Sequence, residues 1–112
     1  MLFKLGNLIM TKSMNEMVDH ASSASVLLKL ISNKQRLMIL CLLHENELSV
    51  GTLNEHLPNL SQSALSQHLA QLRKANLVKT KRQSQTILYS LADSKAVEVI
   101  HLLHKLYCGS GN

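Results

Sequence analysis

The segment from Leu48 to Val78, LSVGTLNEHLPNLSQSALSQHLAQLRKANLV, limits the possible folds more strongly than any other part of this chain. Ser49 can cap a first short helix, whose inner face consists of three apolar residues, Val50, Leu53 and Leu57. Pro58 and Asn59 end that helix. Ser61 can cap a second helix, whose inward positions are all leucine, namely Leu65, Leu69 and Leu72. Two short helices joined by a tight turn, the second with a polar start and a basic end, predict a helix-turn-helix.

Two more helices are predicted before this segment. Apolar and small residues recur at helical spacing from Met14 to Ile31 and define a first amphipathic helix. Asn33 can cap a second helix, one face of which is expected to carry Leu37, Leu40, Cys41 and His44. The polar sequence at residues 45–47 then separates this helix from the helix-turn-helix.

A β-hairpin and a last helix are predicted after the segment. Asn76 suits the left-handed conformation that often ends a helix. Residues 77–81 and 86–91 are typical of strands, and residues 82–85 connect them without the Asn-Gly signal of a tight turn. The last helix is expected from Ser94 to Tyr107, with an apolar stripe of Val97, Ile100, Leu103 and Tyr107. The predicted fold class is therefore mainly α with a small β-hairpin, a winged helix-turn-helix in the order α-α-α-α-β-β-α.

The length of 112 residues suits a single domain. We expect this domain to span residues 14–108, between a flexible N-terminal extension at 1–13 and a flexible tail at 109–112. Only three residues are aromatic, so the core must be aliphatic, and stacking platforms for single-stranded nucleic acid are not expected. No apolar run is long enough to cross a bilayer, and no signal-peptide cleavage site follows the first residues. We therefore expect a cytoplasmic protein with no membrane partner.

Positive charge is concentrated around the helix-turn-helix. The formal net charge is +5, and no acidic residue occurs between Glu55 and Asp93. That interval contains five basic residues, Arg73, Lys74, Lys79, Lys81 and Arg82. Such residues can form an ordinary solvated face. Their coincidence with the helix-turn-helix instead favours a surface that binds the phosphates of double-stranded DNA.

Polar residues of the second helix in the motif are candidates for reading bases. Those facing away from the leucines are Gln62, Ser63, Ser66 and Gln67, and they are adjoined by His68. Gln can form two hydrogen bonds to adenine and Ser can serve several bases, although on most helices such residues are simply solvated. Contacts to the DNA backbone are expected from Arg73 and Lys74 at the end of this helix. On the hairpin, contacts to phosphate or the minor groove are expected from Lys79, Lys81, Arg82 and Gln83.

Four stretches carry a resemblance to a known family. Residues 33–40 read NKQRLMIL, residues 47–53 read ELSVGTL, residues 60–69 read LSQSALSQHL and residues 72–78 read LRKANLV. With these motifs the chain resembles the ArsR/SmtB family of winged-helix repressors. The resemblance implies a homodimer, formed through the first and last helices, that an inducer releases from operator DNA. The apolar stripes of those two helices independently favour a second copy of the chain as partner.

The metal-binding motifs of that family are absent. Ser49 and Gly51 stand where one group of family members has cysteines, and neither is a soft ligand. In the last helix, the histidine expected after Asp93 is replaced by Lys95, and the later His-x-x-Glu pattern is missing. We therefore expect no metal and no cofactor. The alternative is a metal-responsive repressor with a different site, in which His101 and His104 bind an ion with Glu98 or Cys108.

Cys41 and Cys108 are the only cysteines. In a reducing compartment both should be thiols, so a disulfide between them is expected to be regulatory and not structural. Spacing alone favours an inert buried Cys41 and a Cys108 in a frayed tail. However, the pair also resembles the branch of the family that senses reactive sulfur or oxidants with two cysteines. That resemblance implies that persulfide or oxidant modification of the two residues lowers operator affinity by changing the dimer.

Two other functions fit the sequence less well. A thiol enzyme needs a nucleophile with a base and an orienting group in a pocket, and the chain has no CxxC motif, glycine-rich phosphate loop or paired carboxylates. We therefore expect that the protein is not an enzyme. A winged helix that binds only protein is disfavoured by the basic residues of the motif.

Overall fold

The computed structural model describes residues 12–108, so most of the predicted N-terminal extension and the predicted tail at 109–112 lie outside the described residues. The chain divides into two compact units, one ending at Leu30 and one beginning at Ile31. Helix α1, Lys12–Ile31, makes up the described part of the first unit, and its last residue begins the second. Several large apolar side chains of α1 are more than half exposed, namely Met17, Val18, Val26 and Leu28.

Helix α2, Lys34–Leu42, opens the second unit. The predicted cap is confirmed, since the amide of Arg36 donates a hydrogen bond to Oδ1 of Asn33 at 3.0 Å. The predicted inner face of this helix was wrong in part. The side chains that are fully buried are Ile39, Leu40 and Leu43, whereas His44 lies beyond the end of the helix. The core therefore touches α2 on a face rotated from the predicted one, which leaves Cys41 half-buried.

The helix-turn-helix consists of α3, Val50–His56, and α4, Gln62–Lys74. Both predicted caps are confirmed: Ser49 accepts from the amide of Thr52 at 3.2 Å, and Ser61 accepts from the amide of Ala64 at 3.0 Å. The turn is fixed by the side-chain amide of Asn54, which donates to the carbonyls of Leu57 and Leu60. The leucines predicted to face inward from α4 are all buried, namely Leu65, Leu69 and Leu72.

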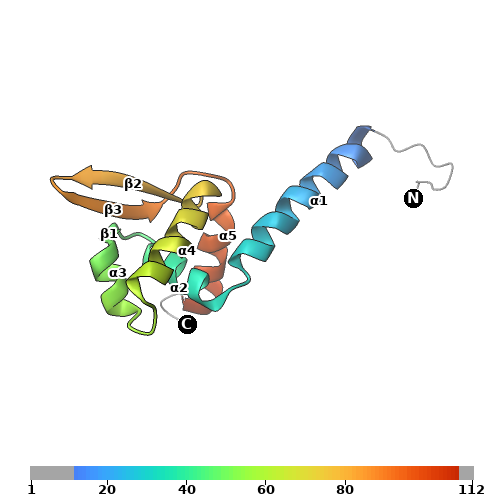
Figure 1. The fold of residues 1–112 in the computed structure, drawn as a ribbon. Coiled ribbons are helices and arrows are strands. Elements are labelled where there is room, and N and C mark those ends of the chain that lie inside the picture. Colours follow the sequence, from blue (N-terminus) through green and yellow to red (C-terminus); the bar gives the residue numbers. More distant parts are fainter. Residues whose placement is uncertain (1–11, 109–112) are drawn as a thin grey trace. The chain divides into compact units, whose positions relative to one another are not determined.

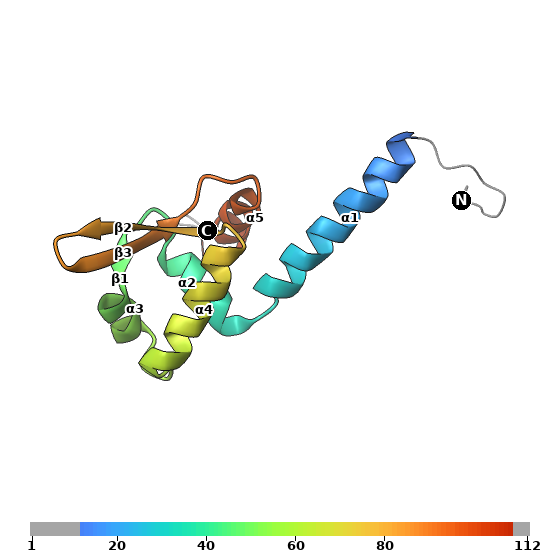
Figure 2. The same cartoon turned by 45° about the horizontal axis from the view of Figure 1, so that its top comes forward.

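A three-stranded antiparallel sheet follows, in the order β1-β3-β2. Strands β2, Val78–Gln83, and β3, Thr86–Leu91, form the predicted hairpin, which projects beyond the helices of this unit in both Figure 1 and Figure 2. The predicted four-residue connection was wrong, because β2 continues to Gln83 and Ser84, with a φ of 58°, opens a shorter turn. Strand β1, Leu48–Ser49, was not predicted, and it pairs Leu48 with Tyr89.

The C-terminal helix begins later than predicted. Residues 94–96 form a turn, because the hydroxyl of Ser94 donates to the carbonyl of Asn76 at 3.0 Å and anchors the chain there. Asn76 itself has a φ of 63°, which confirms its predicted left-handed conformation. Helix α5, Val97–Leu103, then continues as a π-helical segment η1, His104–Cys108. The predicted stripe fails at its end, since the wider π turn leaves Tyr107 exposed.

Candidate nucleic-acid interface and sensory residues

The N-terminal half of α4 presents polar side chains over a buried leucine face. All four predicted base-reading residues are exposed, namely Gln62, Ser63, Ser66 and Gln67. The hydroxyl of Ser61 already caps the helix, so the side chains of the first two turns need not satisfy the backbone themselves. Such a helix end, with exposed hydrogen-bonding groups and no acidic residue in its first turn, suits contact with the edges of bases.

His68 differs from the other candidates on α4 because it is half-buried. Burial, and then the positive charge of Arg36 on α2, lower the pKa of His68 from its usual value of 6.5. The same arginine donates a hydrogen bond from Nη1 to Oε1 of Gln71 at 3.2 Å. The lowered pKa favours the neutral form of the His68 imidazole, which can donate or accept a hydrogen bond.

The end of α4 and the sheet border a common hollow. This hollow measures about 430 Å³ and is lined by Ser66, Leu69, Ala70, Arg73, Lys74 and Tyr89. It is distinct from a second cavity of about 670 Å³ that borders α2. The two basic residues at its rim are exposed, as expected for groups that contact a DNA backbone. Tyr89 comes from β3, so the hairpin face that carries Tyr89 is the one nearer to α4.

The four candidates on the hairpin divide between its two faces. Because Thr80 pairs with Tyr89, even-numbered residues of β2 share the face of Tyr89, and this group includes Arg82. The other face carries Lys79, Lys81 and Gln83. Both lysines of that face have acidic partners: Nζ of Lys79 lies 3.5 Å from Asp93 and Nζ of Lys81 lies 3.4 Å from Glu47. Nε of Arg82 donates to the backbone carbonyl of Ser84 at 3.2 Å, and Arg82 has no acidic partner among the described residues.

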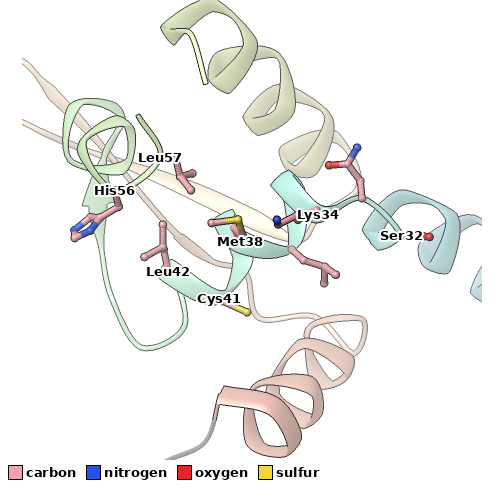
Figure 3. Close-up of a pocket in the computed structure, with 9 residues that line it drawn as sticks. Ser32, Lys34, Met38, Cys41, Leu42, His56 and Leu57 are labelled. Atoms are coloured by element: carbon pink, nitrogen blue, oxygen red, sulfur yellow. The ribbon is translucent and has the colours of Figure 1, made fainter. Parts of the chain in front are cut away.

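Cys41 lies on α2 at the wall of the larger cavity. This cavity of about 670 Å³ is lined mostly by apolar side chains, and Figure 3 shows Cys41 together with Met38, Leu42 and Leu57 around it. The sulfur of Cys41 is directed in this view toward the ribbon of α5. The backbone of Cys108 ends η1, while its side chain lies outside the part of the chain that can be described.

A cluster of histidines, not predicted from the sequence, joins the end of α2 to the end of α5. The rings of His44 and His104 are stacked, with centroids 3.9 Å apart and planes at 13°. The ring of His101 meets that of His44 edge-on, with centroids 5.0 Å apart. The only signal in the sequence was the position of two of these residues near the cysteines, because His44 follows Cys41 closely and His104 shortly precedes Cys108.

The residues at the metal-binding positions of α3 do not fit a metal. The hydroxyl of Ser49 caps α3 and bonds to Oγ1 of Thr52 at 3.2 Å, and Gly51 offers no side chain. Among the side chains that the structure describes, those of residues 13–107, no three histidine, cysteine or acidic groups are arranged so that they could hold a metal ion. The described helices also include none with the length and hydropathy needed to cross a membrane.

Sequence comparison finds relatives among bacterial regulators. Residues 33–80 match the family described as "Bacterial regulatory protein, arsR family". The chain is 51% identical over 96 residues to the transcriptional activator HlyU of Vibrio cholerae serotype O1, an alignment that covers 86% of this chain and 88% of the relative. The predicted family resemblance is thereby confirmed, and the relatives are regulators and not enzymes, as expected.

Solved structures agree with the sequence relatives. Reduced HlyU from Vibrio cholerae N16961 superposes with a TM-score of 0.76 at 53% identity, over 83% of this chain and 97% of that one. The transcriptional repressor BigR from Xylella fastidiosa superposes with a TM-score of 0.79 at 35% identity, over 88% of this chain and 96% of that one. These likenesses confirm the predicted winged helix-turn-helix fold class.

Proposed function

Because the chain belongs to the ArsR family of bacterial regulatory proteins, which bind DNA to control transcription, we propose that it acts as a homodimer whose operator affinity is switched at Cys41 and Cys108. The observation that carries the DNA-binding part is the surface of α4, where exposed polar residues cover three buried leucines. The switch draws its support from the cysteine pair and from the half-buried position of Cys41 at an open cavity.

In this proposal α4 enters the major groove and the hairpin lies along the backbone. Gln62, Ser63, Ser66 and Gln67 read base edges, and Arg73 and Lys74 contact phosphates. Arg82 contributes from the hairpin face nearer to α4. His68, which is half-buried and has a lowered pKa, supports the helix or donates a single hydrogen bond.

A second copy of the chain is the proposed partner of two apolar surfaces. Exposed apolar residues on α1 include Met17 and Val26, and those on α5 and η1 are Leu102, Leu106 and Tyr107. Apolar side chains of this size rarely remain exposed in such number on a small monomer. A two-fold dimer would present two copies of α4 to successive major grooves, which are about 34 Å apart.

The proposed switch follows the ordinary chemistry of thiols. A thiolate of one cysteine attacks a sulfane sulfur of a polysulfide, forms a new S–S bond and expels the remaining sulfur chain as a thiolate. The thiolate of the second cysteine then displaces that modification and leaves a bridge between the two residues. With peroxide, the first product is a sulfenic acid with loss of water or hydroxide, and the second thiolate displaces hydroxide from it.

A modest change in the dimer is enough for regulation. A bridge would tie α2 to the segment that follows α5, and a disulfide requires Cα atoms roughly 4.4–6.8 Å apart. Any movement that this requires is transmitted to the spacing between the two copies of α4. A hundredfold loss of operator affinity needs only about 2.7 kcal/mol of differential binding between the two states.

The proposal is tested by titrating operator DNA with the full chain before and after treatment with an organic tetrasulfide or diamide. We expect a large loss of affinity on treatment of the wild-type chain, and none for Cys41→Ser or Cys108→Ser, which should still bind DNA when reduced. Mass spectrometry of the same samples reports whether the two residues are bridged. Equal affinities of the reduced and bridged proteins would rule out the switch while leaving DNA binding intact.

A further inference from the structure

We propose that the stacked rings of His44 and His104 form a clamp that holds the two cysteine-bearing segments together, and that positive charge accumulating on the stack opens it. The inference rests on the proposed function, because the clamp matters for regulation only if Cys41 and Cys108 react with each other. It assigns a positioning role to His44 and His104, which belong neither to the proposed DNA-binding surface nor to the pair of reacting cysteines.

The first ring is tied closely to Cys41. The backbone amide of His44 donates to the carbonyl of Cys41 at 3.2 Å, so the histidine is fixed to the last turn of α2. Between them lies Leu43, which is buried in the core with 1% of its surface exposed. The position of the His44 ring is therefore set by the same residues that set the position of Cys41.

The second ring is tied to the segment that ends in Cys108. His104 is the C-terminal cap of α5 and its amide bonds to the carbonyls of Ile100 and His101. Ile100 is buried, so this end of α5 is anchored in the core. From His104 the chain continues as the single π turn of η1 to Cys108, so the ring stack lies at the base of the segment that carries the second cysteine.

The geometry of the cluster limits how much charge it can hold. Two nearly parallel imidazoles with centroids 3.9 Å apart attract each other when at least one is neutral, and two positive charges at that distance repel. Burial, and then the charges of His104 and His101, lower the pKa of His44 from 6.5, whereas Glu45 acts in the opposite direction. The charges that act on His44 thus come from Glu45 on the α2 side and from His104 and His101 on the α5 side.

The sign of the pH effect follows from this lowered pKa. The folded protein binds fewer protons at His44 than the unfolded chain does, so the stack contributes its full stability above pH 6.5. That contribution is lost as the pH falls through the lowered pKa of the folded state. Because all three histidines retain contact with solvent, screening keeps the effect on global stability small, and the local position of η1 is the more sensitive quantity.

The clamp affects the two steps of the sulfur chemistry differently. The first step needs one thiolate and a reagent, so it does not require the two segments to be together. The second step needs both cysteines in reach of each other. Opening the clamp should therefore lower the ratio of bridged protein to singly modified protein, beyond the decrease that the smaller thiolate fraction causes in acid.

The experiment measures that ratio by intact-mass spectrometry after a fixed exposure of the full chain to an organic tetrasulfide, from pH 5.5 to pH 7.5. Between pH 7.5 and pH 5.5, we expect the ratio of bridged to singly modified protein to decrease several-fold more in the wild-type chain than in His44→Phe. That variant keeps an aromatic ring that cannot be protonated. His44→Ala should give a low ratio throughout, with rescue by His44→Phe at low pH. Identical pH profiles for the wild type and His44→Phe would overturn the proposal.

A measurement on the reduced protein separates the clamp from the switch. In NMR spectra without any sulfur reagent, the ring protons of His44 and His104 should show contact with each other at pH 7.5, and this contact should disappear on acidification. If no bridge forms at any pH, the proposed switch fails, while this titration still decides the clamp. If a bridge forms but the two rings show no contact at pH 7.5, the clamp is wrong and the switch stands.

Discussion

At the scale of single residues, two basic side chains of β2 differ sharply in their surroundings. Lys79 is ion-paired to Asp93 and lies on the hairpin face away from Tyr89. Arg82 lies on the face of Tyr89, which borders the hollow beside α4, and its guanidinium donates a hydrogen bond to the backbone carbonyl of Ser84. The basic residues of the hairpin are therefore not equivalent, although the sequence placed all of them in one acid-free interval.

This difference predicts unequal effects on DNA binding. Arg82→Ala should weaken operator binding and lower the dependence of log Kd on log salt by about one phosphate contact. Lys79→Ala is the matched control, and we expect a smaller loss, because that lysine must first leave its carboxylate partner. Fluorescence anisotropy with labelled operator at several salt concentrations measures both quantities. Equal losses for the two variants would mean that both faces of the hairpin meet the DNA.

At the scale of elements, one residue at the N-terminus of α4, Ser61, is expected to affect both the stability of the fold and the affinity for DNA. Ser61 caps the helix, so Ser61→Ala should cost about 1 kcal/mol of stability. Ser61→Asp should restore the cap and interact favourably with the helix dipole. However, it also places a negative charge beside Gln62 and Ser63, where the proposed phosphates approach, so operator binding should weaken.

The matched control for this variant is on the preceding helix. Ser49→Asp changes a cap of the same kind on α3, which is not the proposed recognition helix. Thermal unfolding measures the stability of each variant, and titration with operator DNA measures its affinity. If Ser61→Asp bound operator as tightly as the wild type, α4 would not be the helix that approaches the DNA.

The elements that were predicted from the sequence are those with local signals. Asn33, Ser49 and Ser61 cap helices through their own side chains, so residues a few positions away are enough to define them. Strand β1 exists only because it pairs with β3, far along the chain, and two residues carry no pattern of their own. The stack of His44 on His104 likewise joins two residues that are far apart in the sequence. Capping residues within a few positions of each helix start were therefore enough to predict the helix-turn-helix. The histidine stack near Cys41 depends on contacts between distant parts of the chain, so the sequence did not reveal it.

At the scale of the whole molecule, assembly of two chains is the step on which operator binding depends in the proposed mechanism. Leu106 lies in η1 with 59% of its surface exposed, next to the charged residue Lys105. A glutamate at position 106 would have to be desolvated in an apolar dimer interface, and even as the neutral acid this costs about 1–3 kcal/mol for each copy. Two-fold symmetry applies this cost twice, so Leu106→Glu should weaken the dimer by at least about 2–6 kcal/mol.

Sedimentation at a series of concentrations measures that change, and operator titration shows its consequence. Lys105→Glu changes the charge at the neighbouring exposed position and serves as the matched control, with little expected effect on the dimer. Because each chain alone presents only one α4, the Leu106→Glu monomer should bind a full operator much more weakly than the wild-type chain does, while binding non-specific DNA almost as well. A Leu106→Glu protein that remained dimeric at low concentration would place the interface elsewhere and remove the route by which the cysteines are proposed to act on the DNA.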